Sequence, residues 1–298
     1  MATLPHLSIE TITLTIPVNS DDQQQVKGRM EHALTLYQNS LESQRPQGRY
    51  RFGYTLTAPN GEAIQIESQP LRVDYNYLKL AYSPARIGPE GTALLAIYLS
   101  EILGPSYRED FYGGRLQRIE VSFELQGMIL DNLWIYRAGA RDKKVALIFD
   151  ADLGLQSVIV GYDSTRRLVF SQEACGQADV EPCVRVAYLH DKGIYALSDF
   201  YAQLDDPLQP ITIRHYMPLP DMDEISSRML FDSCRIRGRS QVLAMYPKGD
   251  ERKSVKAATM RFPAIDASKL KLAIWLQLRG EIDTLLPLIE GGEAVSVL

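Results

Sequence analysis

The chain has 298 residues, of which 45% are hydrophobic and 23% are charged, enough for one large domain or two modest ones with a proper core. Its formal net charge is −5, and because a dedicated nucleic-acid binder is usually basic, the overall charge argues against DNA binding. The three cysteines are widely spaced, which excludes a disulfide framework and a Cys-x-x-Cys metal knuckle.

The cellular location follows from several absences in the sequence. Free thiols fit a reducing cytosol, although a bridge between Cys175 and Cys183 across their short loop stays open. The N-terminus lacks the pattern of a signal peptide, and no run of apolar residues approaches the eighteen or so that span a bilayer. We therefore expect a cytoplasmic protein without a membrane partner.

The first part of the chain combines strands with a helix. Residues 8–16 alternate strictly and predict a strand, whereas residues 21–44 carry apolar side chains at helical spacing and predict a helix. Two β runs at 49–58 and 62–68 are joined by an Asn-Gly turn, and a further alternating strand follows at 71–82.

The rest of the chain continues in the same manner and ends in helices. Gly104-Pro105 terminates an apolar helix at 91–104, and Asp163-Ser164-Thr165 forms the turn of a tight hairpin. The predicted strands are 115–125, 129–136, 144–149, 156–161, 167–171, 183–189 and 210–216. The predicted helices are 192–204, 225–246, 249–261 and 266–285.

These elements predict an α+β fold with an antiparallel sheet core, helices on one face and a helical C-terminal segment. The outline of strand, helix and strands occurs twice before residue 216, which suggests a duplicated βαβ-type unit. The predicted domains are residues 1–216, which form the α+β part, and residues 217–298, which form the helical segment packed on it.

The strand at 115–125 carries two carboxylates. Its alternation places Glu120, Ser122 and Glu124 on one face and apolar side chains on the other. A half-exposed antiparallel strand explains this pattern by itself. Alternatively the two carboxylates hold Mg²⁺ or Mn²⁺, because hard cations prefer oxygen ligands and neutralise charge beside a scissile phosphate.

Basic residues gather near the C-terminus of this acidic chain. Between Arg235 and Arg261 there are eight basic residues and two acidic ones. Such charges form either a solvated helix face or a set of phosphate contacts that release counterions from DNA. The residues assigned to DNA binding are Arg235, Arg237, Arg239, Lys248, Arg252, Lys253 and Lys256.

Several short motifs occur in an order known from one family. Arg118-Ile119-Glu120, with Glu124 beyond it, follows an apolar helix that Ser83-Pro84-Ala85-Arg86 precedes, and Arg235-Ile236-Arg237-Gly238 comes later, before Pro247-Lys248. Over residues 70–275 this order resembles the nicking domain of the rolling-circle replication initiators of filamentous phages and small plasmids. The resemblance implies binding to origin or hairpin DNA, action in pairs as a homodimer, and recruitment of a helicase or recombinase.

The same comparison shows departures at the positions that carry the family's chemistry. Family members have tyrosines and a lysine in the hairpin, where this chain has Ile159, Phe170 and Gln172. Phenylalanine has no hydroxyl to attack a phosphate, and Ala187 stands where relatives carry a metal-binding glutamate. We therefore expect a DNA-binding, replication-initiator-like protein of a mobile element or phage that lacks nicking activity.

Two alternatives stay open. Tyr188, beside His190, or Tyr162, at the hairpin tip, could replace the missing tyrosine, and the chain would then be an active nickase with Mg²⁺ or Mn²⁺ at Glu120 and Glu124. In the other alternative the sheet is a scaffold for protein–protein interaction, and DNA is not the partner.

Overall fold

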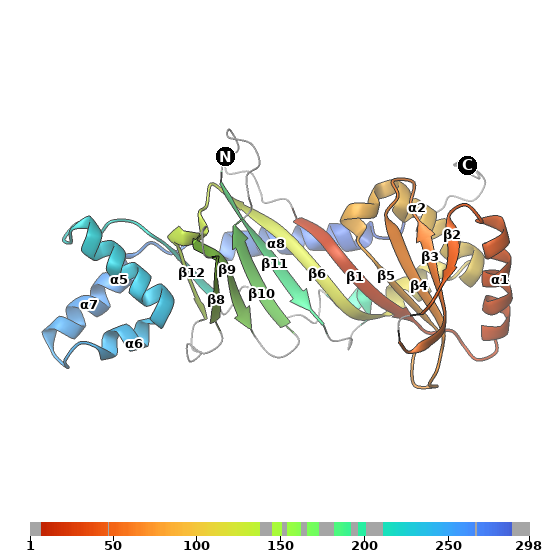
Figure 1. Ribbon diagram of the computed structural model, residues 1–298, viewed down its shortest axis with the longest axis horizontal. Coiled ribbons are helices and arrows are strands. Elements are labelled where there is room, and N and C mark those ends of the chain that lie inside the picture. The colour runs from red at the N-terminus through yellow and green to blue at the C-terminus, as the bar shows by residue number, and fades with distance from the viewer. Residues whose placement is uncertain are drawn as a thin grey trace. The chain divides into compact units, whose positions relative to one another are not determined.

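The computed structural model describes residues 7–46, 48–137, 145–150, 154–161, 166–172, 182–191, 196–200, 211–265 and 267–287 (Figure 1). Within them the predicted α+β class is confirmed, since helices accompany a large sheet and a second sheet of two strands. Every strand pair whose register is described is antiparallel. No helix of the described residues has both the length and the apolar character to cross a membrane.

The chain divides into two compact units, each assembled from separate stretches. Unit A comprises the described residues of Ser8–Val121, His190–Leu204 and Gln277–Leu298, and unit B those of Met1–Leu7, Ser122–Leu189 and Asp205–Leu276. The boundary predicted at residue 216 stays a prediction.

Unit A is a sheet with helices. Its elements are β1 (Leu7–Ile16), α1 (Gln23–Leu36), β2 (Leu41–Gln44), β3 (Tyr50–Thr57), β4 (Ala63–Pro70), β5 (Leu78–Tyr82), α2 (Pro84–Leu103), α3 (Tyr107–Gly113), the first part of β6 (Arg115–Gln126) and the 3₁₀ turn Leu197–Asp199. The alternating apolar residues of β1 are buried, and Leu14 lies opposite Leu80 of β5. Ser83 caps α2 by accepting a hydrogen bond from the backbone N–H of Arg86, the role that serine commonly has before a helix.

Unit B combines strands with the C-terminal helices. Its elements are the rest of β6, the 3₁₀ turn η1 (Leu130–Asn132), β7 (Leu133–Arg137), β8 (Val145–Asp150), β9 (Gly154–Gly161), β10 (Arg166–Gln172), β11 (Cys183–His190), β12 (Ile211–His215), α5 (Glu224–Arg237), α6 (Arg239–Ala244), α7 (Asp250–Arg261) and the first part of α8 (Ala267–Asp283). β12 pairs with β7 in a separate two-stranded sheet, in which Ile213 lies opposite Ile135.

The two units order their strands in the same way. In unit A the sequence across the sheet is β1-β5-β4-β3-β2, and in unit B it is β6-β11-β10-β9-β8. In both, the first strand pairs with the last strand of a four-strand meander. The predicted duplication is therefore confirmed in strand order. The helices are not repeated with it, because α1 follows β1, whereas η1 and β7 follow β6 among the described residues.

Several predicted elements differ from the structure. The strand predicted at 129–136 begins at Leu133, after η1, and the helix predicted at 192–204 is described only at 196–200, where the structure has the 3₁₀ turn Leu197–Asp199.

The helix predicted at 225–246 is broken at Gly238, whose φ of 81° is a left-handed conformation that glycine adopts without strain. The strand predicted at 71–82 begins only at Leu78, because the preceding residues form a turn despite their alternation. The helix predicted at 21–44 ends at Leu36, and β2 follows.

Candidate nucleic-acid interface

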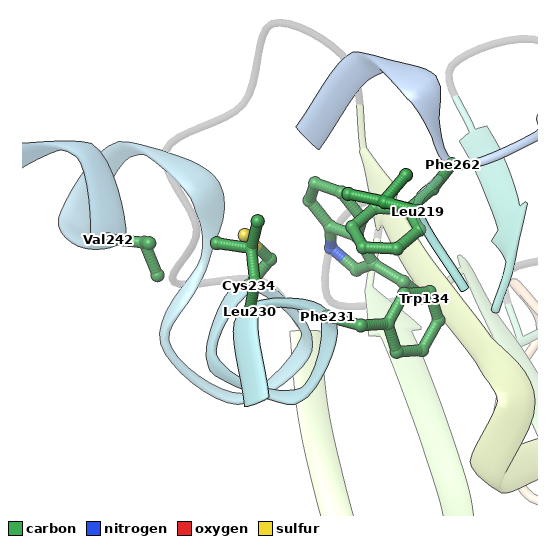
Figure 2. Close-up of a cluster of buried hydrophobic side chains, with 7 residues drawn as sticks. All are labelled: Trp134, Leu219, Leu230, Phe231, Cys234, Val242 and Phe262. Carbon is green, nitrogen blue, oxygen red and sulfur yellow. The ribbon is translucent and has the colours of Figure 1, made fainter. Parts of the chain in front are cut away.

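Helices α5, α6 and α7 pack side by side and carry the predicted basic window (Figure 1). They border a buried cluster to which Trp134 of β7, residues of α5 and α6, and residues of the flanking segments contribute (Figure 2), and Val255 and Ala258 of α7 pack against it. The seven buried members of this cluster are Trp134, Leu219, Leu230, Phe231, Cys234, Val242 and Phe262. The three helices therefore have a hydrophobic core of their own within unit B.

Phe231 lies at the centre of this cluster. Its ring is fully buried, and ring centroids of Trp134, Tyr216 and Phe262 lie 6.4, 5.4 and 5.1 Å away, all in edge-to-face geometry. Such aromatic pairs favour this arrangement because the positive edge of one ring meets the negative face of another. Burial in the same cluster raises the pKa of the Cys234 thiol to about 12.

The ends of α5 are fixed by local chemistry. The carboxylate of Asp223 accepts a hydrogen bond from the backbone N–H of Ser226 and so caps the helix start. Hydrogen bonds from the hydroxyl of Ser226 and from its backbone N–H lower the pKa of Asp223, since they favour the charged carboxylate. The helix ends at Gly238, whose N–H donates to the carbonyl of Cys234.

A pair of arginines on α5 holds η1. Arg235 Nη1 lies 2.8 Å from Asp131 Oδ1, and Arg235 Nη2 lies 3.1 Å from Asp232 Oδ1. Arg228 donates to Asn132 Oδ1 and to the carbonyl of Asp131. The side chain of Arg235 is only 7% exposed. Arg235 was assigned to DNA contact from sequence, but these bonds place it in an internal ion pair where a phosphate cannot reach it without breaking them.

β12 carries a second internal arginine, Arg214, which is not among the residues singled out from the sequence. Its buried guanidinium donates to the carbonyls of Met260 and Phe262 at the C-terminal end of α7, and to the hydroxyl of Tyr136. A cation at this end of a helix satisfies the last carbonyls and opposes the negative end of the helix dipole. No signal in the sequence distinguished it, because Arg214 occupies an ordinary position in a short strand.

The remaining basic residues of the window divide into paired and unpaired groups. Lys253 forms an ion pair with Asp250, and Arg261 forms one with Asp221. Within the part of the chain that the structure describes, the cations of the window without a carboxylate partner are Arg237, Arg239, Lys248, Arg252 and Lys256.

Four of these unpaired cations belong to α6 and α7 and the turn between them. Arg239 Nε donates to Thr259 Oγ1 at 3.1 Å, and its Nη2 lies 3.4 Å from the carbonyl of Lys256, so the guanidinium lies against α7. Arg252 and Lys256 are four residues apart and therefore lie on one side of α7, and Lys248 lies in the turn that precedes this helix. We call Arg239, Lys248, Arg252 and Lys256 the basic face. Arg237 is exposed at the end of α5 and contacts the sulfur of Met245.

The two carboxylates of β6 are half-buried, and each has a local partner. Glu120 lies 3.8 Å from Arg118 Nη2, while Glu124 accepts a hydrogen bond from Gln126 at 2.6 Å. Residues four apart on a strand are separated by ~13 Å, whereas metal–oxygen bonds are about 2.0–2.6 Å long. Glu120 and Glu124 share a face, as predicted, and both side chains would have to extend along the strand to ligate one ion, so the metal site stays a prediction. The described residues include no cluster of three potential metal ligands.

The hairpin positions that carry the family's tyrosine and lysine have structural roles here. Phe170 is fully buried and lies opposite Val158 of β9. The carboxamide of Gln172 accepts from the backbone N–H of Leu130 at 2.7 Å and donates to the carbonyl of Cys183 at 2.9 Å. A lysine could only donate, so glutamine suits this position and links η1, β10 and β11.

Of the two alternative tyrosines, Tyr188 lies within the described residues and Tyr162 does not. Tyr188 is 5% exposed on β11, and Ala187 beside it is also buried. Burial on both sides of this strand keeps the Tyr188 hydroxyl away from a phosphate in solution. His190 is buried as well, with its ring 5.9 Å from that of Phe200.

The sequence matches no known family model and no curated protein.

Proposed function

We propose that this chain binds DNA through the basic face of α6 and α7 and does not nick it. The proposal rests on one observation: within the described part of the chain, some cations of the basic window have a carboxylate partner and others do not. Arg235, Lys253 and Arg261 each have a carboxylate partner, but the four residues of the basic face have none among the described residues. Cations that remain uncompensated in an acidic protein are suited to neutralise phosphates, which releases counterions from DNA.

The connection between the two helices supports the same proposal. α6 and α7 are joined by a five-residue turn, Met245 to Gly249, which carries Lys248 of the basic face. Helix-turn-helix proteins use a pair of helices joined by a turn of about three or four residues, one or two shorter than this one, with the second helix in the major groove and nearby cations on the phosphates. α7 is the corresponding helix here, and the exposed Lys256 and partly exposed Arg252 would lie beside the groove.

The proposal that the chain does not nick DNA rests on the hairpin residues and on Tyr188. Phe170 fills the core, Gln172 bridges backbone groups, and Tyr188 is buried, so none of them presents a nucleophile. The competing hypothesis is a nickase that uses Tyr188 or Tyr162 with Mg²⁺ or Mn²⁺. The assay is incubation with labelled single-stranded origin-type DNA and Mn²⁺, followed by a denaturing gel. We expect no covalent adduct, and an adduct that a Tyr188→Phe or Tyr162→Phe change abolishes would establish the nickase.

The binding claim is tested with two variants of equal net charge. Arg252→Ala with Lys256→Ala removes two unpaired cations, and Lys253→Ala with Arg261→Ala removes two that are ion-paired. Fluorescence anisotropy with a labelled duplex should show at least about tenfold weaker binding for the first variant, because each removed cation gives up a phosphate contact. The second should change binding much less. Equal losses in both would mean that only net charge matters, and that the basic face is no specific interface.

The resemblance to rolling-circle initiators supports the finer part of the proposal, namely an origin-type or hairpin target, action as a homodimer, and contact with a helicase or recombinase. A comparison of hairpin DNA with a duplex of the same composition tests the first of these. Equal affinity for the two would contradict recognition of an origin.

A second candidate function is protein–protein interaction, and one feature of α5 favours it. Ile225, Met229 and Ile236 are 74, 65 and 56% exposed, and their spacing places them within about 40° of one another around the helix. Exposed apolar surface of this kind is typical of binding sites for other proteins. A second copy of the chain would fit the expected homodimer. Sedimentation velocity should then show a dimer that Met229→Ser dissociates, and a monomer at all concentrations would exclude it.

A further inference from the structure

Unit A contains a polar pocket that is separate from the basic face. Its volume is about 360 Å³, within the usual range for small-molecule sites. Its walls come from the end of β1, the segment before β3, the turn before β5, and the start of β6. The residues that matter below are Thr15, Arg49, Tyr75, Asn76, Arg115 and Gln117.

The pocket has a positive charge once its ion pairs are counted. Lys79 of the lining lies 2.6 Å from Glu67, which neutralises it. Asp74 accepts two hydrogen bonds from Arg72, at 3.1 and 3.2 Å, and is neutralised in turn. Arg49 and Arg115 have no carboxylate partner within the described ranges. Two guanidinium groups are therefore available to an anion at this pocket.

Arg49 is also held in place. Its guanidinium carbon lies 5.0 Å from the centroid of the Tyr75 ring, and Arg72 lies 5.7 Å from the same ring. Contact of a cation with an aromatic face is attractive, and it limits the conformations that a long side chain adopts. Arg49 is thus partly preorganised, which lowers the entropic cost of binding a ligand there.

Two residues of the lining, Asn76 and Gln117, carry side-chain amides whose nitrogens are engaged. Asn76 Nδ2 donates to the carbonyl of Thr15 at 3.2 Å and to its hydroxyl at 3.1 Å. Because a carbonyl can only accept, the amide nitrogen of Asn76 must face Thr15, and its oxygen is left for another partner. Gln117 Nε2 likewise donates to the Thr15 hydroxyl, at 3.3 Å, while that hydroxyl donates to the carbonyl of Arg115. Among the described residues, no donor occupies either amide oxygen.

We propose that this pocket binds a nucleotide unit. Arg49 and Arg115 would hold its phosphate, since guanidinium groups match phosphate oxygens in charge and geometry. The amide oxygens of Asn76 and Gln117 would accept hydrogen bonds from the sugar hydroxyls or from the amino group of the base. The ligand is either a free nucleotide or one nucleotide of a single strand, because both offer the same phosphate beside hydrogen-bond donors. No residue of the basic face takes part, so this inference stands apart from duplex binding.

The test is calorimetric titration of the full chain with three probes: AMP, a short single-stranded oligonucleotide and inorganic phosphate. We expect AMP or the oligonucleotide to bind at least about tenfold more tightly than phosphate, because the amide contacts add to the charge contacts. If AMP binds and the oligonucleotide does not compete with it, the ligand is a free nucleotide. If the oligonucleotide binds more tightly than AMP, the ligand is a nucleotide within a single strand. Binding of phosphate alone, or of none of the probes, would overturn the proposal.

Three variants locate the site. Arg49→Gln and Arg115→Gln should each weaken binding about tenfold or more, the usual cost of removing one charged contact. Arg51→Gln is the matched control, since Arg51 is an exposed cation of β3 that does not line the pocket. Equal affinity for all three variants would place the binding elsewhere. Unchanged duplex affinity in Arg115→Gln would show that the two proposals succeed or fail separately.

Discussion

Replacing Phe231 with alanine should destabilise unit B. The side chain is fully buried and meets three aromatic rings. Truncation of a buried phenylalanine costs about 3–5 kcal/mol through lost burial and the cavity left behind. The ring contacts stabilise beyond burial alone, so we expect the upper part of that range, about 4–5 kcal/mol. With a urea dependence of about 2 kcal/mol per molar, the midpoint of unit B should fall by about 2 M.

Trp134 reports this transition directly, because its ring lies 6.4 Å from that of Phe231. The chain has two tryptophans, so a Trp275→Phe background makes Trp134 the only emitter. The matched control is Ile225→Ala on the same helix, whose side chain is 74% exposed and whose loss should shift the free energy of unfolding by no more than about 0.5 kcal/mol. A Phe231→Ala midpoint equal to that of the control would refute the conclusion that the aromatic cluster stabilises α5 to α7.

Three further outcomes follow from buried polar groups and a buried thiol. Gln172→Lys leaves the backbone N–H of Leu130 without its acceptor and should lower the free energy of unfolding by about 1–3 kcal/mol in urea titrations; an unchanged midpoint would contradict the bridging role. Burial raises the pKa of the Cys234 thiol from 9.0 to about 12, so between these pH values the folded chain keeps a proton that the unfolded chain loses. The stability that the buried neutral thiol contributes should therefore be complete below pH 9 and disappear between pH 9 and about 12. In a Cys175→Ser background the folded protein should accordingly resist thiol reagents at pH 8, and rapid labelling would show that the cluster opens. Arg235→Ala should lower stability by about 1–3 kcal/mol and leave the salt dependence of DNA binding unchanged, whereas a smaller slope would return Arg235 to the interface.

Local patterns in the sequence were sufficient to predict much of the fold. The alternation in β6 and the hairpin of β9 and β10 predicted strands because the side-chain period of a strand is visible within a few residues. The break at Gly238 was missed because helical periodicity continues on both sides of it, and only the backbone angle shows the end of α5. Residues 71–77 alternate like a strand but form a turn in which residues 71–74 are exposed and Tyr77 is buried, since alternation does not ensure pairing with a neighbour.

The candidate site was only partly predictable, for a physical reason. The excess of basic residues is a property of composition and was visible at once. Which of them are available depends on partners far away in the chain. Arg235 forms its ion pair with Asp131, 104 residues earlier in the chain. The side-chain oxygen of Gln172 likewise accepts a hydrogen bond from the distant backbone N–H of Leu130. Pairs of residues far apart in the chain produce no periodic pattern in the sequence. The sequence therefore could not show that, among the described residues, Arg235 is ion-paired and Lys256 is not.

The salt dependence of DNA binding tests the central claim most directly. The logarithm of the association constant falls linearly with the logarithm of salt concentration, with a slope of about 0.9 for each neutralised phosphate. The Arg252→Ala, Lys256→Ala variant should reduce this slope by nearly two relative to the unaltered chain, while the Lys253→Ala, Arg261→Ala control keeps it. A slope that is the same in all three proteins, or near zero in the unaltered chain, would contradict DNA binding through the basic face.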